Sequence, residues 1–207
     1  FWLLLVGGFT PIPLKLFTIA AALDTNTVKP DTGFDTNNGA YMIPGRKTPI
    51  RDVHGYPYLT VADIIKHSSN IGSVKIAQRL GKENFYKYLT GFGFGAKTKI
   101  ELPGEQNGWV RNYTRWRDVE FATMAYGYGI TVTPIQIAGA LAAFGNDGIY
   151  TPPRIIASVK RDGNVLYQAN GEPRRVVSSK TAKQLRTMMA AVFESGKLGG
   201  TAHDLVV

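Results

Sequence analysis

Apolar residues along the chain follow two kinds of spacing, one typical of helices and one typical of short strands. Residues 14–23 are mostly apolar and predict a buried helix, which a polar, turn-rich stretch at 24–38 follows. Helical patterns also flank residues 68–70 and cover residues 85–91, 133–144 and 179–193. Strand-like patterns cover residues 41–43, 49–53, 154–160 and 165–168. Because helices and antiparallel strands are segregated along the chain, we predict an α+β fold.

Cap and turn residues mark several of these boundaries. Thr60 opens a plausible capping box before one helix of the 68–70 region. Thr133, Pro134 and Gln136 form a strong helix start, with a threonine N-cap, proline at the first helical position and glutamine three residues after the cap. The turn at 161–164, Arg-Asp-Gly-Asn, indicates a hairpin between two strands.

Candidate chemistry is concentrated in two places, Lys15 and the tripeptide Ser68-Ser69-Asn70. Each has an ordinary interpretation. Lys15 could be a solvated lysine at a helix start, and serine and asparagine often hydrogen-bond nearby backbone in turns. No Ser-x-x-Lys occurs anywhere in the chain, and position 12, three residues before Lys15, is isoleucine.

Several segments together resemble the transpeptidase domain of class B penicillin-binding proteins, of the septal, cell-division type. The segments that carry the resemblance are KLFTIAAALD (15–24), VKPDT (28–32), IRDVHGYPYLTVADIIKHSSNIGSVKIAQRLG (50–81), FYKYLTGFGFG (85–95), WRDVEFATMAYGYGITVTP (116–134) and AFGNDGIYTPP (143–153). The resemblance implies a penicillin-binding-protein or serine β-lactamase-like transpeptidase fold, incomplete at both ends.

The same resemblance implies roles for the candidate residues. Lys15 matches the lysine of the family's first motif, Ser-x-x-Lys. Ser68 would relay a proton, Asn70 would hold the substrate's amide, and Ser69 would face away. The implied reaction is serine-type acyl transfer that cross-links peptidoglycan at D-Ala-D-Ala, without a cofactor. The implied partners are the peptidoglycan stem peptide, β-lactams, the inner membrane, the divisome and a glycosyltransferase, at the periplasmic face of the bacterial inner membrane.

The chain departs from the family pattern at two motifs. Ile12 stands where the nucleophilic serine belongs, and isoleucine has no hydroxyl. The third motif, Lys-Thr/Ser-Gly, is absent; the nearest approaches start at Lys47, Lys97 and Lys180 and lack the glycine. We expect that motif beyond Val207. The chain is therefore predicted to be a partial, inactive domain; alternatives are a non-catalytic divisome scaffold or decoy, and a chimeric or truncated product without function.

Residues 1–14 give a different expectation from residues 15–207, which form the predicted partial domain. FWLLLVGGFTPIPL resembles the Gly-Phe-Thr-Pro-Ile-Pro segment of DedA-type membrane proteins and suggests a chimera joined near Lys15. A degenerate homologue or an upstream frameshift are the alternatives. The apolar run is too short and too interrupted by proline to span a membrane of about 20 helical residues by itself.

Composition limits the remaining possibilities. Hydrophobic residues make up 44% and charged residues 19%, which are globular values. The net charge of +9 is scattered, so we expect no nucleic-acid partner. The three histidines lack metal-ligand spacing, and there is no cysteine, so no metal is expected. The glycines at 91–95 lack the Gly-Lys-Ser/Thr of a phosphate loop, so no nucleotide is expected.

The resemblance also leads to an expectation about packing. Because the central sheet of the transpeptidase fold would be incomplete in this chain, helices 14–23 and 179–193 should lose apolar packing against it.

Overall fold

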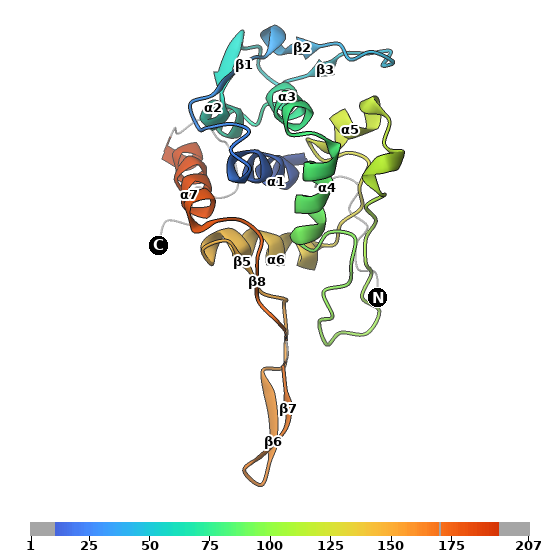
Figure 1. Cartoon of the computed structure of the whole chain (residues 1–207), viewed down its shortest axis with the longest axis vertical. Coiled ribbons are helices and arrows are strands. Elements are labelled where there is room, and N and C mark those ends of the chain that lie inside the picture. Colours follow the sequence, from blue (N-terminus) through green and yellow to red (C-terminus); the bar gives the residue numbers. More distant parts are fainter. Residues whose placement is uncertain (1–10, 170, 195–207) are drawn as a thin grey trace.

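The computed structural model describes residues 11–169 and 171–194, a helical body from which one hairpin projects (Figure 1). The helices are α1 (Pro11–Asp24), α2 (Val61–Lys66), α3 (Asn70–Leu80), α4 (Lys82–Gly91), α5 (Asp118–Met124), α6 (Pro134–Gly145) and α7 (Ser179–Glu194), with 3-10 turns η1 (Asn37–Gly39) and η2 (Tyr113–Arg115). The antiparallel strand pairs are β1 (Gly33–Asp35) with β4 (Tyr58–Thr60), β2 (Ala40–Tyr41) with β3 (Ile50–Arg51), β5 (Ile149–Tyr150) with β8 (Arg174–Arg175), and β6 (Ser158–Arg161) with β7 (Asn164–Gln168).

Helix α1 runs through the centre of the helical body and is surrounded by α3, α4 and α7 (Figure 1). Its Phe17 ring lies within an aromatic cluster, with ring centroids 4.9 Å from Phe92, 5.0 Å from Phe94 and 5.5 Å from Phe144. The buried Thr18 hydroxyl donates to the carbonyl of Ala125, 2.9 Å away, which ties the helix to the segment after α5. Contacts with several neighbouring segments therefore hold the Phe17 and Thr18 side chains of α1 in place.

The expectation that helices 14–23 and 179–193 lose apolar packing is wrong for the described residues. On α1 the side chains of Leu14 and Phe17 are each 1% exposed. On α7 the buried apolar residues are Ala182, Leu185 and Met188. These apolar side chains are buried against other helices and not against a sheet, because α7 contacts α1, α2 and α6 directly. The described strands form only two-stranded sheets, so the fold is α+β with a mainly helical core.

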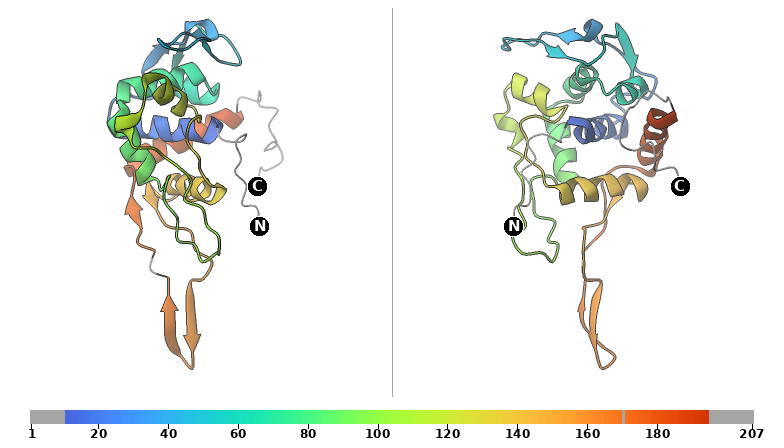
Figure 2. Two further views of the ribbon diagram at one scale, coloured as in Figure 1. Left: turned by 90° about the vertical axis from the view of Figure 1, so that its right-hand side faces the viewer. Right: turned by 180° about the vertical axis from the view of Figure 1, so that it is seen from behind.

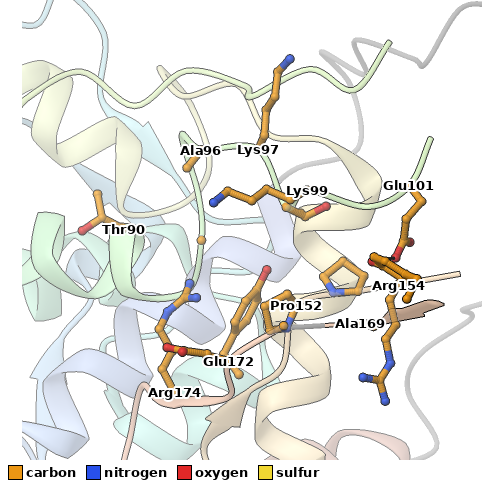
Figure 3. A pocket seen from close by; sticks show the side chains of 16 residues that line it. Thr90, Ala96, Lys97, Lys99, Glu101, Pro152, Arg154, Ala169, Glu172 and Arg174 are labelled. Carbon is orange, nitrogen blue, oxygen red and sulfur yellow. Dashed lines mark hydrogen bonds between the residues drawn. The ribbon is translucent and has the colours of Figure 1, made fainter. Parts of the chain in front are cut away.

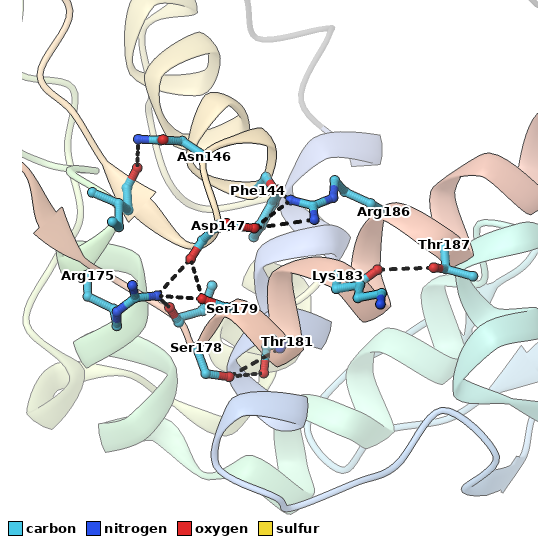
Figure 4. A network of polar contacts seen from close by, with 12 residues as sticks. Phe144, Asn146, Asp147, Arg175, Ser178, Ser179, Thr181, Lys183, Arg186 and Thr187 are labelled. Carbon is cyan, nitrogen blue, oxygen red and sulfur yellow. Dashed lines mark hydrogen bonds and ion pairs between the residues drawn. The ribbon is translucent and has the colours of Figure 1, made fainter.

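A polar network fixes α7 against the end of α6 (Figure 4). The guanidinium of Arg186 donates to the carbonyl of Phe144 at 2.7 Å and to the Asp147 carboxylate at 3.3 Å. Arg175 donates to the Asp147 carbonyl at 2.7 Å. The chain turns here through a left-handed Asp147 and Gly148, with φ of 48° and 81°. These contacts explain how α7 reaches its position beside α1.

The predicted helix starts are confirmed. Thr60 caps α2 and Thr133 caps α6, each with a complete capping box. Gln136 also donates to the carbonyls of Ala96 and Asn107, at 2.7 and 3.0 Å, so the cap of α6 holds the loop after α4. Ser178 caps the start of α7 by accepting a hydrogen bond from the Thr181 amide at 3.1 Å.

The predicted hairpin is confirmed as β6 and β7, whose residues are exposed and which extend away from the helical body in every view (Figure 2). The described helices include none long and apolar enough to cross a membrane. The expected boundary after residue 14 falls within α1, and residues 1–10 lie outside the described residues, so that division of the chain stays a prediction.

Candidate active site

Lys15 and Ser68, 53 residues apart in sequence, are in direct contact. The Lys15 ammonium donates to the Ser68 hydroxyl at 2.8 Å and to the Ser68 carbonyl at 2.5 Å. Lys15 lies on the first turns of α1, and Ser68 lies in the turn between α2 and α3. The packing of α1 against α2 and α3 brings the two together. The structure thus joins two of the three residues singled out from the sequence.

The backbone of Ser68 is left-handed, with φ of 52°. Such a conformation is costly for a residue with a side chain and persists only where surrounding contacts impose it. The contacts here are backbone hydrogen bonds from the Ser68 amide to the Ile65 carbonyl and from the Ser69 amide to the Ile64 carbonyl, at 3.1 and 3.0 Å. This tight turn places the hydroxyl and the carbonyl of Ser68 within hydrogen-bond distance of the Lys15 ammonium.

Asp52 holds the start of α3 and was not identified from the sequence. Its carboxylate accepts hydrogen bonds from the Ser69 hydroxyl at 2.6 Å and from the backbone amides of Asn70 and Ile71 at 2.6 and 3.1 Å. A carboxylate is favoured at a helix N-terminus, where backbone N–H groups lack helical partners. Asp52 lies 18 residues before Asn70, and no local spacing rule connects them.

Ser69 has a structural position, as expected for the residue that faces away. It is 2% exposed, and its hydroxyl caps α3 by accepting from the Gly72 amide at 2.9 Å while donating to Asp52. A second structural pair adjoins the turn: the Tyr56 hydroxyl lies 3.2 Å from Nδ1 of His67. The sequence pointed to neither partner of that pair as a contact.

Asn70 is the first residue of α3, two positions after Ser68, and among the described residues it makes no hydrogen bond with Lys15 or Ser68. Its side-chain NH2 donates to the carbonyl of Arg51 at 2.8 Å. Among the described residues, nothing donates to its side-chain oxygen, and the residue is half-buried. The Asn70 side-chain amide is therefore held in one orientation, and its oxygen can accept a hydrogen bond from a ligand.

Burial lowers the pKa of Lys15 from 10.5 to about 8, and the nearby negative charge of Asp52 acts in the opposite direction. Removing a charged amine from water disfavours its protonated form, which is the larger of the two effects here. At pH 7.5 a lysine with such a pKa is neutral in about a quarter of molecules, compared with about one in a thousand at the ordinary pKa. Lys15 can thus both donate and accept a proton near neutral pH.

Comparisons with known proteins identify the family of the chain. The family model described as "Penicillin binding protein transpeptidase domain" matches residues 14–206. The chain therefore belongs to the penicillin-binding protein transpeptidase domain family, and the predicted class B relationship and α+β transpeptidase fold are confirmed.

Individual relatives show the extent of the similarity. The chain is 35% identical over 188 residues to penicillin-binding protein PbpB of Mycolicibacterium smegmatis, covering 89% of this chain and 28% of that protein. It is 36% identical over 186 residues to the probable peptidoglycan D,D-transpeptidase PenA of Neisseria meningitidis, covering 90% and 30%. The chain spans less than a third of the length of these relatives.

Solved structures share the fold. Penicillin-binding protein 3 of Mycobacterium tuberculosis, complexed with aztreonam, has a TM-score of 0.81 at 31% identity, covering 89% of this chain and 41% of that one. The transpeptidase domain of Burkholderia pseudomallei penicillin-binding protein 3 has a TM-score of 0.77 at 38% identity, covering 89% and 53%. The comparisons give no support to the DedA-type chimera expected for residues 1–14.

Proposed function

We propose that this chain forms the lysine–serine part of a peptidoglycan D,D-transpeptidase site and that it binds the stem peptide without becoming acylated. The observation that supports the lysine–serine site is the contact between Lys15 and Ser68 at 2.8 Å. The pKa of this lysine is lowered to about 8, which suits proton transfer. The isoleucine at position 12 supports the proposal that the chain does not become acylated.

The lysine–serine pair is suited to moving a proton. A neutral Lys15 amine can take a proton from a hydroxyl placed next to it, and the Ser68 hydroxyl can pass a proton between that amine and a departing group. Asn70, whose side-chain NH2 is anchored on Arg51, would offer its side-chain oxygen to an N–H of the stem peptide. Each of these roles is carried by residues 15, 68 and 70, as the resemblance implied.

The acyl-transfer step needs a nucleophile, and position 12 cannot supply one. In α1, which begins at Pro11, position 12 lies one helical turn before Lys15. A serine there would attack the carbonyl between two D-alanines, lose its proton to the lysine, form an ester and release the terminal D-alanine. Isoleucine has no oxygen with which to form that ester. Loss of a nucleophile removes most of the rate and leaves only binding and electrostatic stabilisation.

The isoleucine also favours the second candidate function, a binding module without catalysis that acts as a scaffold or decoy in the divisome. In either case the ligands would be the stem peptide and β-lactams, and the partners a glycosyltransferase and the divisome. The place of action would be the periplasmic face of the inner membrane. Support for the ligand class comes from the M. tuberculosis relative, whose solved structures include complexes with aztreonam and ampicillin.

Intact-mass spectrometry tests the proposal. The 207-residue chain is incubated with ampicillin, with penicillin-binding protein 3 of M. tuberculosis as the positive control. We expect an adduct on the control and an unchanged mass for this chain. A stoichiometric ampicillin adduct on this chain overturns the proposal, and the mapped position would identify the nucleophile.

A further inference from the structure

A concave site lies away from the lysine–serine pair and shares no residue with it. It is a pocket of about 590 Å³ between the loop after α4, residues 93–101, and the base of the β6–β7 hairpin (Figure 3). Ligand pockets of proteins have volumes of about 300–1,000 Å³, and this one falls within that range. Nothing in the proposed function uses it, so its role goes beyond that function.

The lining of this pocket carries an excess of positive charge. Four basic side chains line it, Lys97, Lys99, Arg154 and Arg174, together with two carboxylates, Glu101 and Glu172. In the part of the chain that the structure describes, none of the four basic groups forms an ion pair, although other arginines and lysines of the protein do. Unpaired cations gathered in a concavity favour an anionic ligand.

Glu101, one of the two carboxylates, has partners of its own. It accepts hydrogen bonds from the Ile155 amide at 2.9 Å and from the Tyr167 hydroxyl at 3.1 Å. These contacts lower the pKa of Glu101, so the group stays ionised while it ties the loop to the hairpin base. Its two carboxylate oxygens therefore bind the wall of the pocket, and Glu101 forms no ion pair with any of the four basic side chains among the described residues.

Two of the four basic residues, Lys99 and Arg174, are held in place by contacts within the protein. The backbone at Lys99 is left-handed, with φ of 65°, and Glu105 fixes it by accepting from the amides of Thr98 and Lys99 at 2.6 and 3.0 Å. Arg174 donates to the carbonyl of Gly91 at 3.0 Å, and its guanidinium lies 4.2 Å from the centre of the Tyr150 ring. Figure 3 shows the Lys99 and Arg174 side chains reaching toward the same part of the pocket. Preorganisation of this kind lowers the entropic cost of binding.

Apolar groups complete the surface. Pro152 and Pro153 form part of the pocket wall, and the exposed Ile155 and Ile156 lie just beyond it, after Arg154 in the sequence. We propose that this pocket binds an extended acidic peptide segment of a partner protein, with its carboxylates on Lys99 and Arg174 and its apolar side chains against the prolines and isoleucines. Charge complementarity and the mixture of basic and apolar lining favour such a peptide over a simple inorganic anion.

Fluorescence anisotropy tests the assignment. The probe is a fluorescein-labelled pentapeptide of alternating glutamate and valine, titrated with the 207-residue chain at about 20 mM salt, where screening is weak. The test protein carries Lys99→Asn with Arg174→Gln; asparagine tolerates the left-handed backbone at position 99. The matched control carries Lys47→Asn with Arg115→Gln, which removes the same charge from exposed positions outside the pocket. The single variant Lys99→Asn is measured as well, so that the test can still be made if the double variant does not fold. Thermal unfolding is recorded for the parent and every variant.

We expect the double variant to bind the peptide at least tenfold more weakly than the parent, the single variant to lose at least threefold, and the control to change less than twofold. A pentapeptide with glutamine in place of glutamate should bind at least tenfold more weakly to the parent. An equal loss in the control variant means diffuse electrostatic attraction and overturns the proposal. Equal binding of the glutamine peptide, or displacement of the probe by inorganic phosphate at constant ionic strength, also overturns it.

Discussion

Replacing Asp52 with asparagine should both destabilise the fold and change the proton affinity of Lys15. The carboxylate accepts three hydrogen bonds at the start of α3, from the Ser69 hydroxyl and from the amides of Asn70 and Ile71. Asparagine keeps the shape of the side chain but replaces one acceptor oxygen by an NH2 group. If the side-chain oxygen of the new asparagine keeps the two backbone amides, its NH2 group faces the Ser69 hydroxyl, which loses its charged acceptor.

The magnitude follows from these contacts. A net hydrogen bond to a charged group contributes about 1.5–3 kcal/mol, and a buried donor left without an acceptor costs about 1–3 kcal/mol. The favourable charge at the helix N-terminus adds about 0.3–1 kcal/mol. Because asparagine retains part of the bonding, we expect Asp52→Asn to lower the free energy of unfolding by about 3 kcal/mol. The pKa of Lys15 should also fall below its value of about 8, since Asp52 raises it.

Urea unfolding of the parent and the variant measures the first effect, and Asp118→Asn is the matched control. Asp118 pairs with Lys82 at 2.7 Å, but its side chain is 84% exposed. Exposed pairs contribute about 0–1 kcal/mol, so the control should lose about 1 kcal/mol or less. Equal losses for the two variants, or a Lys15 pKa that rises in Asp52→Asn, would refute the reasoning.

Three further predictions concern the lysine, the nucleophile position and a tight turn. Since folded Lys15 releases its proton near pH 8 and the unfolded lysine near 10.5, the unfolded state binds more protons between these values, and stability rises with pH. From pH 7 to 9.5 the parent should gain about 2 kcal/mol in urea unfolding relative to Lys15→Met; a constant difference contradicts this. Ile12→Ser should remain without an ampicillin adduct in intact-mass spectra, because the chain contains no Lys-Thr/Ser-Gly; an adduct on that serine would disprove it. Gly148→Ala should cost more than about 2 kcal/mol, because φ is 81° and its Cβ would lie against the Val177 carbonyl, whereas Gly163→Ala, with open space around it, should cost about 1 kcal/mol; calorimetric melting compares them.

Local signals predicted much of the fold. The capping boxes at Thr60 and Thr133 and the turn at 161–164 depend on residues within four positions of one another, and the structure has all three. The short strands β1, β4, β5 and β8 were missed, because two or three residues give too little alternation to distinguish a strand from a turn. The helical pattern at 85–91 ends where α4 ends, at Gly91, and a left-handed glycine follows at Gly93, with φ of 94°.

The candidate site shows the same division between local and long-range information. Lys15, Ser68 and Asn70 could be chosen because each resembles a family motif, and the structure joins the first two. Asp52 could not be chosen, because its hydrogen bonds connect positions 18 residues apart and depend on how β3 ends beside α3. The error about α1 has a similar origin: a buried helix can be covered by helices or by a sheet, and its own apolar pattern is the same in both cases.

The central claim is that Lys15 is a buried lysine poised to exchange a proton with Ser68. Titration of the lysine Nζ resonances by NMR tests it most directly, with Lys15 assigned by the signal that disappears in Lys15→Arg. The account predicts a midpoint near pH 8 for that signal. A midpoint near the ordinary value of 10.5 would mean that burial does not lower the proton affinity of the amine, and it would contradict the proton-transfer role proposed for Lys15.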